Sequence, residues 1–302
     1  MDIIKRIQEN DPSITELFER LTNSDLCFMK GNTNLKKLKI LDSNITTISG
    51  LEGNTTLTDL NLGNNFIVDF SILRHHPSLK TLNIYFNPVV DFSFLYDLDS
   101  LSSLSVFCTK ITDISLFCEL RGLQYLDVAH NLISDLSPLS HNTTLTDVNV
   151  RYNPINNIEF LRSNTTLTRL DACACGIITD ISALQSNSTL TYLNARHNNI
   201  SDLSVLSSNT TLTTLYLSDN IITDLLPLRN TSTLQFLYLE VNNIQDASCL
   251  LDNVNLCEIR LEGNPLPREE VKVFERIGNM NAMNYDNRIS SLFNLILRHI
   301  KL

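Results

Sequence analysis

The sequence predicts a solenoid of stacked 22-residue coils, each of which contributes one short strand to a parallel β-sheet. Leucines recur every 22 residues, with a single interval of 23. When each leucine is taken as position 1, positions 4 and 6 are aliphatic and position 9 is usually asparagine. Positions 4 and 6 alternate as a half-buried strand requires, and one coil is too small to bury a core alone. The position-1 leucines are Leu35, Leu57, Leu79, Leu101, Leu123, Leu145, Leu167, Leu190, Leu212, Leu234 and Leu256.

Two further polar positions recur with the coil. An amide both donates and accepts hydrogen bonds, so we expect the position-9 asparagines to satisfy the backbone where the chain turns. Ser43, Thr109 and Cys175 replace them in three coils, and we interpret Cys175 as structural. In eight of the eleven coils, one aspartate precedes the outer turn and is predicted to cap it. A calcium array is the alternative, but calcium needs several converging oxygens.

Eight Asn-x-Ser/Thr sequons occur, and several of them recur at the same place in the coil. They begin at residues 44, 54, 142, 164, 187, 199, 209 and 230, and several lie in a repeated Asn-Thr-Thr just before a strand. Such a segment forms turns through side-chain bonds to the backbone, so we interpret the sequons as structural rather than as glycosylation sites.

The two flanks are expected to cover the apolar ends of the stack. Residues 1–34 are predicted as an N-terminal cap with helical spacing at 2–9 and 13–22, although residues 14–34 also fit a degenerate repeat. The repeats span residues 35–266, and residues 267–302 are predicted as a C-terminal helical cap. Residues 288–302 contain three basic residues and no acidic one, so a membrane-surface or targeting role is the alternative for them.

Composition excludes several classes of protein. The formal charge of -10 repels nucleic acid, and no apolar stretch is long enough for an integral membrane span. Charges within the first ten residues disfavour a signal peptide, and seven irregularly spaced cysteines suit free thiols in a reducing compartment. We therefore expect a cytoplasmic protein.

The repeated unit resembles a known family. The segments LQYLDVAHNLI at 123–133 and LTTLYLSDNII at 212–222 are similar to leucine-rich repeats, and the 22-residue unit resembles the internalin-like subclass. The resemblance covers residues 35–266 and implies an α/β solenoid of horseshoe form. It would have an inner parallel β-sheet, about 11 repeats and helical caps at both ends. Such a fold implies binding of another protein on the concave face.

The residues of that inner face are unusual. Positions 2, 3, 5, 7 and 8 point away from the core, and chance would place one or two of the eight tyrosines there; six lie there. Tyrosine and arginine are enriched in protein interfaces, which predicts a binding surface. The alternative is that aromatic and arginine stacking only stabilises the sheet. The predicted partner-binding residues are Tyr85, Phe86, Phe107, Tyr125, Arg151, Tyr152, Arg169, Tyr192, Arg196, Tyr216, Phe236 and Tyr238.

An enzyme is the competing class. Cys108 and His130 occupy position 8 of adjacent repeats, about 5 Å apart at strand spacing, and a Cys-His dyad is geometrically feasible. An open sheet encloses no pocket, and no third orienting residue is evident. His130 and His197 lie three repeats apart, so they cannot share a metal ion, and no phosphate-binding loop occurs. We predict no enzyme activity, no cofactor and no metal.

The sequence thus favours non-catalytic protein–protein recognition through the concave face. The resemblance permits a bacterial effector acting on a host protein, located in the host cytosol. The alternative is a resident cytosolic scaffold or a phosphatase-type regulatory subunit. The identity of the partner stays open.

Overall fold

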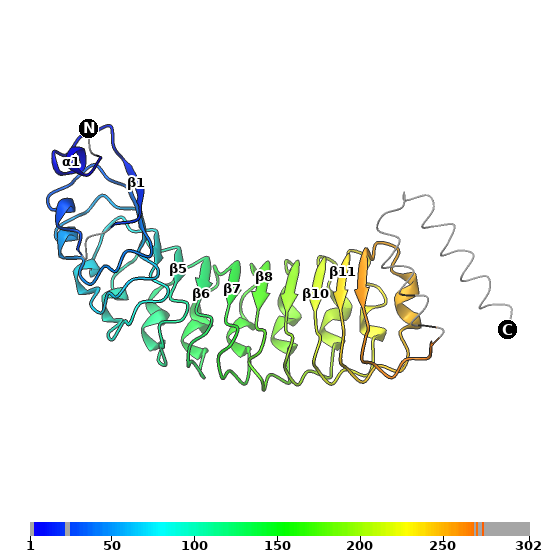
Figure 1. Ribbon diagram of the computed structural model, residues 1–302. Helices are drawn as coiled ribbons and strands as arrows, with labels where there is room; N and C mark the ends of the chain where they lie inside the picture. Colours follow the sequence, from blue (N-terminus) through cyan, green and yellow to red (C-terminus); the bar gives the residue numbers. More distant parts are fainter. Residues whose placement is uncertain (1–2, 22–24, 269, 271–273, 275–302) are drawn as a thin grey trace. The chain divides into compact units, whose positions relative to one another are not determined.

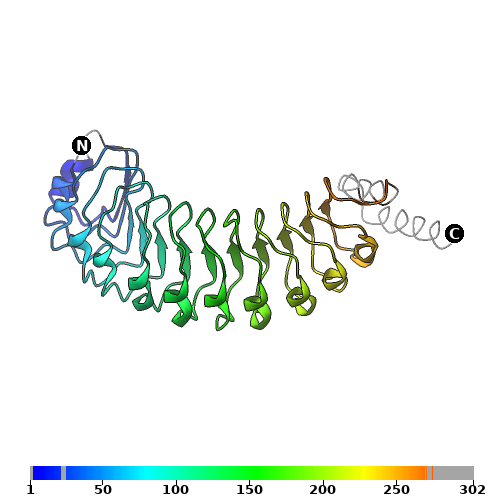
Figure 2. The ribbon, with the colours of Figure 1, turned by 90° about the horizontal axis from the view of Figure 1, so that it is seen from below.

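The protein is described here by a computed structural model covering residues 3–21, 25–268, 270 and 274. The chain divides into two compact units, Met1–Asn153 and Pro154–Leu302. In both units the coils carry a short strand on one side and a 3₁₀ turn on the other (Figure 2). The 22-residue period therefore gives the same local structure in each unit, as predicted.

The described residues of the first unit form one helix and seven strands. Its helix α1 is Ile3–Gln8, and neighbouring strands pair in parallel and in chain order (Figure 1). The strands are β1 (Glu16–Glu19), β2 (Lys37–Ile40), β3 (Asp59–Asn61), β4 (Thr81–Asn83), β5 (Ser103–Ser105), β6 (Tyr125–Asp127) and β7 (Asp147–Asn149). The 3₁₀ turns are η1 (Cys27–Met29), η2 (Ser49–Leu51), η3 (Ser71–Leu73), η4 (Ser93–Leu95), η5 (Ser115–Glu119) and η6 (Ser137–His141).

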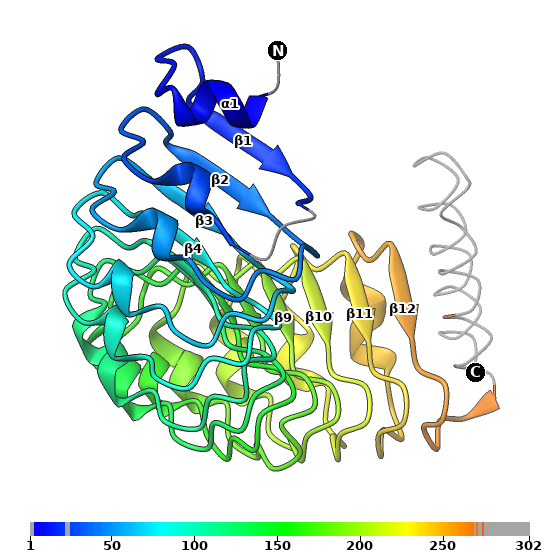
Figure 3. The ribbon, with the colours of Figure 1, turned by 60° about the vertical axis from the view of Figure 1, so that its left-hand side comes forward.

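In the second unit, the part of the chain that the structure describes forms five strands, which also pair in parallel and in chain order. Figure 3 shows β9 to β12 side by side. The strands are β8 (Arg169–Asp171), β9 (Tyr192–Asn194), β10 (Thr214–Tyr216), β11 (Phe236–Tyr238) and β12 (Glu258–Arg260). The 3₁₀ turns are η7 (Glu159–Leu161), η8 (Ser182–Ser186), η9 (Ser204–Ser208), η10 (Leu226–Leu228) and η11 (Ser248–Asp252).

The core of each unit is a stack of aliphatic side chains in register. Leu38 on β2 is aligned with Leu60 on β3, and Leu215 on β10 is aligned with Leu237 on β11. All four side chains are at most 1% exposed. Burial of one such side chain is worth about 1.5–3 kcal/mol, and the gain arises only when a neighbouring coil covers it.

The position-9 asparagines join successive coils. The amide nitrogen of Asn220 donates to the carbonyl oxygens of Leu217 (3.0 Å) and Ser218 (3.3 Å) in its own coil. It also donates to Ala195 of the preceding coil at 2.9 Å. Its amide oxygen accepts from the backbone N–H of Ile200, again in the preceding coil, at 2.9 Å. The structural interpretation of these asparagines is confirmed. Asn65, Asn87, Asn131, Asn153, Asn242 and Asn264 likewise bond to both coils.

The 23-residue coil interrupts this ladder at one point. Its extra residue follows Cys175, where Gly176 adopts a φ of 81°. Asn198 in the next coil still donates to Ala172 O at 2.9 Å, but its buried amide oxygen has no hydrogen-bond partner. We attribute the orphaned oxygen to the insertion, which displaces the donor N–H that an unbroken coil supplies. The Cys175 thiol itself lies 3.9 Å from the carbonyl oxygen of Cys173, consistent with a structural role.

The aspartates cap the outer turns as predicted. In the first unit, Asp91 Oδ1 accepts from the backbone N–H of Ser93 at 2.8 Å, and Asp135 Oδ1 accepts from Ser137 N–H at 2.8 Å. The same bond to the residue two positions ahead occurs at Asp69, Asp113, Asp180, Asp202, Asp224 and Asp246. Each carboxylate serves its own turn.

The Asn-Thr-Thr segments form a second buried ladder. The amide oxygen of Asn142 accepts from the backbone N–H groups of Thr144 (3.0 Å) and Leu145 (3.0 Å), while its nitrogen donates to Leu120 O at 2.9 Å. Five sequon asparagines are buried, which leaves no room for a glycan on their amides in the folded protein. They are Asn54, Asn142, Asn164, Asn187 and Asn209.

The N-terminal region corrects one expectation. A helix is present at Ile3–Gln8, but the helix expected over 13–22 is wrong, because Glu16–Glu19 form strand β1. Leu17 on β1 is aligned with Leu38, so Ile14 and Leu17 occupy positions 1 and 4 of a degenerate repeat. Their spacing of three is shared by helices and by this repeat, so the spacing alone could not separate them.

Toward the C-terminus, Arg268, Glu270 and Phe274 are helical and Phe274 is buried. The amphipathic helix expected at 288–302, and with it the membrane-surface alternative, lies outside the described residues. The expected boundaries at residues 34 and 266 stay predictions. Among the residues that are described, no helix combines the length and apolar character needed to cross a bilayer.

The asparagine ladder makes a graded prediction for stability. Asn220→Ala removes an amide that bonds four backbone groups, so we expect it to lower the free energy of unfolding by about 3 kcal/mol. Asn198→Ala should cost less, about 2 kcal/mol, because its oxygen is already unpartnered. The exposed Asn199 is the control, with an expected change within about 0.5 kcal/mol for Asn199→Ala. Urea denaturation measures all three, and equal effects at 220 and 199 would contradict the ladder.

The aspartate caps predict loss of stability in acid. Backbone N–H groups of Ser93 and Ser137 lower the pKa of Asp91 and Asp135 below the ordinary 3.8. As the pH falls through 3.8, the unfolded chain takes up protons before the folded one, so stability decreases until the lowered pKa is passed. The double variant Asp91→Asn/Asp135→Asn keeps an acceptor oxygen but does not titrate. We expect its stability to fall less than that of the native chain between about pH 5 and pH 3.

Urea denaturation at each pH makes this measurement. The control is Asp99→Asn, at an exposed aspartate in an inter-coil loop, which should retain the acid sensitivity of the native chain. An unchanged pH dependence in the double variant would show that these caps do not supply it.

Candidate functional site

The candidate site is the strand face, which we define as positions 2, 3, 5, 7 and 8 of each coil. These side chains point outward because positions 4 and 6 are held in the core. All twelve partner-binding residues predicted from the sequence are at least partly exposed there. Six lie in the first unit (Tyr85, Phe86, Phe107, Tyr125, Arg151, Tyr152) and six in the second (Arg169, Tyr192, Arg196, Tyr216, Phe236, Tyr238).

Position 8 has a left-handed backbone in every one of the eleven coils, including Phe86 (φ 49°), Tyr152 (φ 55°) and Val241 (φ 54°). Glycine, asparagine and aspartate tolerate this region best, and a β-branched residue there is strained. Phe86 and Tyr152 are each 47% exposed and Val241 is 53% exposed, so core burial does not compensate for the strain. Exposed side chains on a strained backbone of this kind make the strand face the candidate site.

The first unit carries what we call the aromatic row, formed by Tyr85, Phe86, Phe107, His130 and Tyr152. The ring centroids of Phe86 and Phe107 are 5.1 Å apart, and Phe107 meets His130 at 5.0 Å. His130 stacks on Tyr152 at 4.2 Å, and Tyr85 meets Phe86 at 5.8 Å. The structure thus links five rings from four consecutive coils into one contiguous surface.

His130 is the link that the sequence did not assign to the binding surface. The sequence placed it beside Cys108 as a dyad candidate, whereas its ring lies between Phe107 and Tyr152. Within the described residues, no hydrogen bond joins the Cys108 thiol to His130. The geometry gives His130 a packing role in the aromatic row.

The second unit carries the tyrosine–arginine cluster, formed by Arg169, Tyr192, Arg196, Tyr216 and Tyr238. The guanidinium carbon of Arg169 lies 4.0 Å from the ring centroid of Tyr192, and that of Arg196 lies 4.0 Å from Tyr216. Tyr216 stacks on Tyr238 with centroids 4.4 Å apart and meets Tyr192 at 5.6 Å. Cross-strand stacking therefore occurs, and it leaves the rings partly exposed.

Two phenols of this cluster stay protonated over a wide pH range. Burial, and then the negative charge of Glu258, raise the pKa of Tyr238 to about 12. Burial, and then Asp171, raise the pKa of Tyr192 as well. Both side chains are thus neutral hydroxyls at neutral pH, and the Tyr238 hydroxyl already bonds to Glu258.

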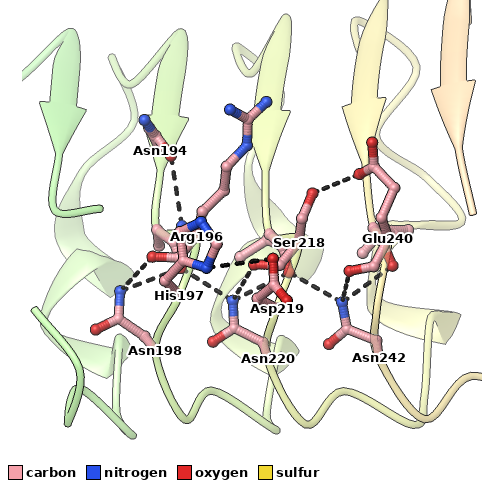
Figure 4. Close-up of polar contacts among 12 residues, drawn as sticks. Asn194, Arg196, His197, Asn198, Ser218, Asp219, Asn220, Glu240 and Asn242 are labelled. Carbon is pink, nitrogen blue, oxygen red and sulfur yellow. Dashed lines mark hydrogen bonds and ion pairs between the residues drawn. The ribbon is translucent and has the colours of Figure 1, made fainter. Parts of the chain in front are cut away.

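The carboxylates of the second unit's face already have donors. The Asp219 carboxylate lies 3.2 Å from His197 Nδ1, and the Ser218 hydroxyl donates to Glu240 (Figure 4). Glu258 pairs with Arg260 at 2.9 Å. Internal polar contacts therefore fix the acidic side chains beside the tyrosine–arginine cluster.

Sequence reasoning missed one part of the face. Phe18 on β1 is 57% exposed, and it lines a hollow of about 480 Å³ together with Glu19, Arg20, Lys39, Leu41 and Asp42. One sequence feature could have revealed it. Ile14 and Leu17 align with positions 1 and 4 of a repeat, which puts Phe18 at position 5, on the strand face. Among the described residues, no three histidine, cysteine or acidic side chains are grouped as a metal site would require.

The stacked coils with their asparagine ladders define a leucine-rich repeat protein. Family models described as leucine-rich repeats match residues 99–141, 141–158 and 188–230. An internalin of Listeria monocytogenes, InlF, is 30% identical in sequence, with a TM-score of 0.82 over 90% of this chain and 80% of that chain. The chain therefore belongs to the leucine-rich repeat family and is of the internalin-like type.

Other structures are more distant. The functional domain of InlJ from Listeria monocytogenes is 26% identical, with a TM-score of 0.55 over 84% of this chain and 47% of that chain. A leucine-rich repeat protein of Leptospira interrogans shares the fold, at 15% identity and a TM-score of 0.59 over 92% and 97% of the two chains. No curated protein matches the sequence. Leucine-rich repeat solenoids are protein-interaction folds, and those of internalin-like type are typically non-enzymatic.

The strained turn at Val241 makes a testable prediction. Val241→Asn places a residue that tolerates the left-handed backbone where a β-branched residue is unfavourable, and little buried surface is lost. We expect the free energy of unfolding to rise by about 1 kcal/mol. Val254→Asn is the control, because Val254 is 59% exposed and has no left-handed backbone. Urea denaturation measures both, and destabilisation by Val241→Asn would show that the side chain has a structural role.

Proposed function

We propose that this chain is a non-catalytic recognition protein that binds another protein on its strand face. The observation that carries the proposal is the exposure of two aromatic side chains, Phe86 and Tyr152, on the strained backbone of position 8. Phe86 and Tyr152 weaken the turns they occupy and are not buried in return. A partner that covers them would recover the hydrophobic free energy that the isolated protein leaves unrealised.

The second unit supports the same function with a different set of side chains, tyrosines next to arginines. Tyr192, Tyr216 and Tyr238 present partly exposed rings next to two arginines. Such side chains combine large apolar area with polar tips, which is typical of the residues that dominate interface energetics. The coils hold them in place before binding, so less conformational entropy is lost on association.

The specific role that we favour is a bacterial effector acting on a host protein. Similarity to an internalin of Listeria monocytogenes supports this role by analogy. In that role the protein would work in the host cytosol. The alternative is a resident cytoplasmic scaffold or a phosphatase-type regulatory subunit.

Affinity capture with quantitative mass spectrometry tests the function and the role together. The native chain serves as bait in bacterial and in eukaryotic lysates. One variant, Phe86→Asn/Tyr152→Asn, alters the aromatic row with a residue suited to the left-handed turn. A second, Tyr192→Ala/Tyr216→Ala/Tyr238→Ala, alters the cluster. We expect a partner whose recovery falls at least about tenfold with either variant, as loss of interface anchors predicts.

A matched control removes exposed apolar side chains elsewhere. Leu226 and Val254 are 60% and 59% exposed and lie off the strand face, so Leu226→Ser/Val254→Ser should leave capture unchanged. Thermal unfolding confirms that each bait is folded. Capture from eukaryotic lysate alone supports the effector role, and capture from bacterial lysate alone supports the resident scaffold. Equal recovery with all baits would place binding outside the strand face.

A further inference from the structure

Arg196, which follows β9 at position 7, has a guanidinium group without a polar partner. The group lies over the ring of Tyr216 at 4.0 Å and is 5.4 Å from the ring of Tyr238. Among the described residues it makes no ion pair and no side-chain hydrogen bond, and its Nε is buried and unpartnered. Figure 4 shows the guanidinium extending away from the asparagine ladder. Stacking on these rings thus fixes the direction in which the guanidinium group points.

This arrangement is unfavourable in the isolated protein. A buried N–H without an acceptor loses its hydration and gains nothing in return. Stacking on tyrosine offsets part of that loss, and it keeps the planar donor fork oriented for an incoming acceptor. Arg151 in the first unit also has a buried, unpartnered Nε at position 7. An unpartnered Nε at position 7 is therefore present in both units.

Nearby carboxylates do not satisfy Arg196. Asp219 is engaged by His197, and Glu240 accepts from the Ser218 hydroxyl. Their negative charges also limit what can bind. A doubly charged phosphate would be repelled by both, whereas a singly charged carboxylate meets less repulsion and matches the guanidinium fork in a bidentate geometry.

We infer that Arg196 is the anchor for a carboxylate of the protein partner, an Asp or Glu side chain of an acidic segment docked on the tyrosine–arginine cluster. The inference rests on the proposed function and specifies the partner's chemistry at one point. The rings of Tyr216 and Tyr238 supply apolar contact for the methylene groups of the incoming side chain. The hydroxyl of Tyr192 supplies a further donor.

Side-chain NMR of the full chain labelled with ¹⁵N-arginine tests the anchor directly. The probes are N-acetyl-glutamate amide, N-acetyl-glutamine amide and inorganic phosphate. We expect the glutamate probe to shift the Arg196 guanidinium N–H resonances at least threefold more than the glutamine probe does. Arg162, which already pairs with Glu159 at 2.7 Å on the outer side of the coil, is the internal control. An Arg196 response no larger than that of Arg162, or a stronger response to phosphate, would overturn the inference.

A peptide array tests the same contact in a longer segment. Each random decapeptide is made with Glu, Gln or phosphoserine at its centre and is probed with the full chain. We expect the strongest binders to prefer Glu over Gln at least fivefold. Arg196→Gln should abolish that preference, Arg196→Lys should retain part of it, and Arg162→Gln should leave it unchanged.

The two proposals fail in different ways. Peptide binding that is lost with Tyr192→Ala/Tyr216→Ala/Tyr238→Ala but shows no Glu preference would refute the carboxylate anchor and leave the proposed function standing. A Glu preference that survives Arg196→Gln would also refute the anchor. Binding that is unaffected by the tyrosine variant would argue against the strand face itself.

Discussion

The structure depends on buried amides that satisfy backbone groups of two coils at once. A solenoid turns its chain sharply once per coil, and each turn leaves carbonyl and N–H groups that strand pairing does not reach. At Asn220, one side chain takes up four such groups and ties its own coil to the preceding one. Coil geometry and coil stacking are thereby fixed by the same contacts. At Asn198, the amide oxygen lacks its hydrogen bond, because the preceding coil contains an extra residue near Gly176.

The same turn positions side chains of the candidate site. The ladder requires the residue before each asparagine to adopt a left-handed backbone, which directs its side chain to the edge of the strand face. Aspartate or glycine occupies this place at Asp219 and Gly263, whereas Phe86, Tyr152 and Val241 do so at a cost in stability. The turn that builds the solenoid thus also displays the exposed side chains on which the proposed binding role rests.

Stability and the proposed recognition are therefore opposed at a few positions. The aromatic row and the unpartnered Arg196 both lower the stability of the isolated protein, through backbone strain in one case and lost hydration in the other. The core leucines and the two asparagine ladders supply the stability that offsets these losses. The ladder asparagines are buried, so substitutions confined to exposed side chains of the strand face should leave their bonds in place.

The sequence by itself determined the repeat, the parallel strands, the roles of Asn220 and Asp91, and the composition of the strand face. These follow from a period of 22 residues, which repeats one local environment in every coil. It did not distinguish strand β1 from a helix, because Ile14 and Leu17 have a spacing that both structures use. Only the tertiary structure decided that His130 joins the aromatic row and that Arg196 lacks a partner. Those properties depend on which side chains of neighbouring coils meet, and spacing along the chain does not specify such contacts.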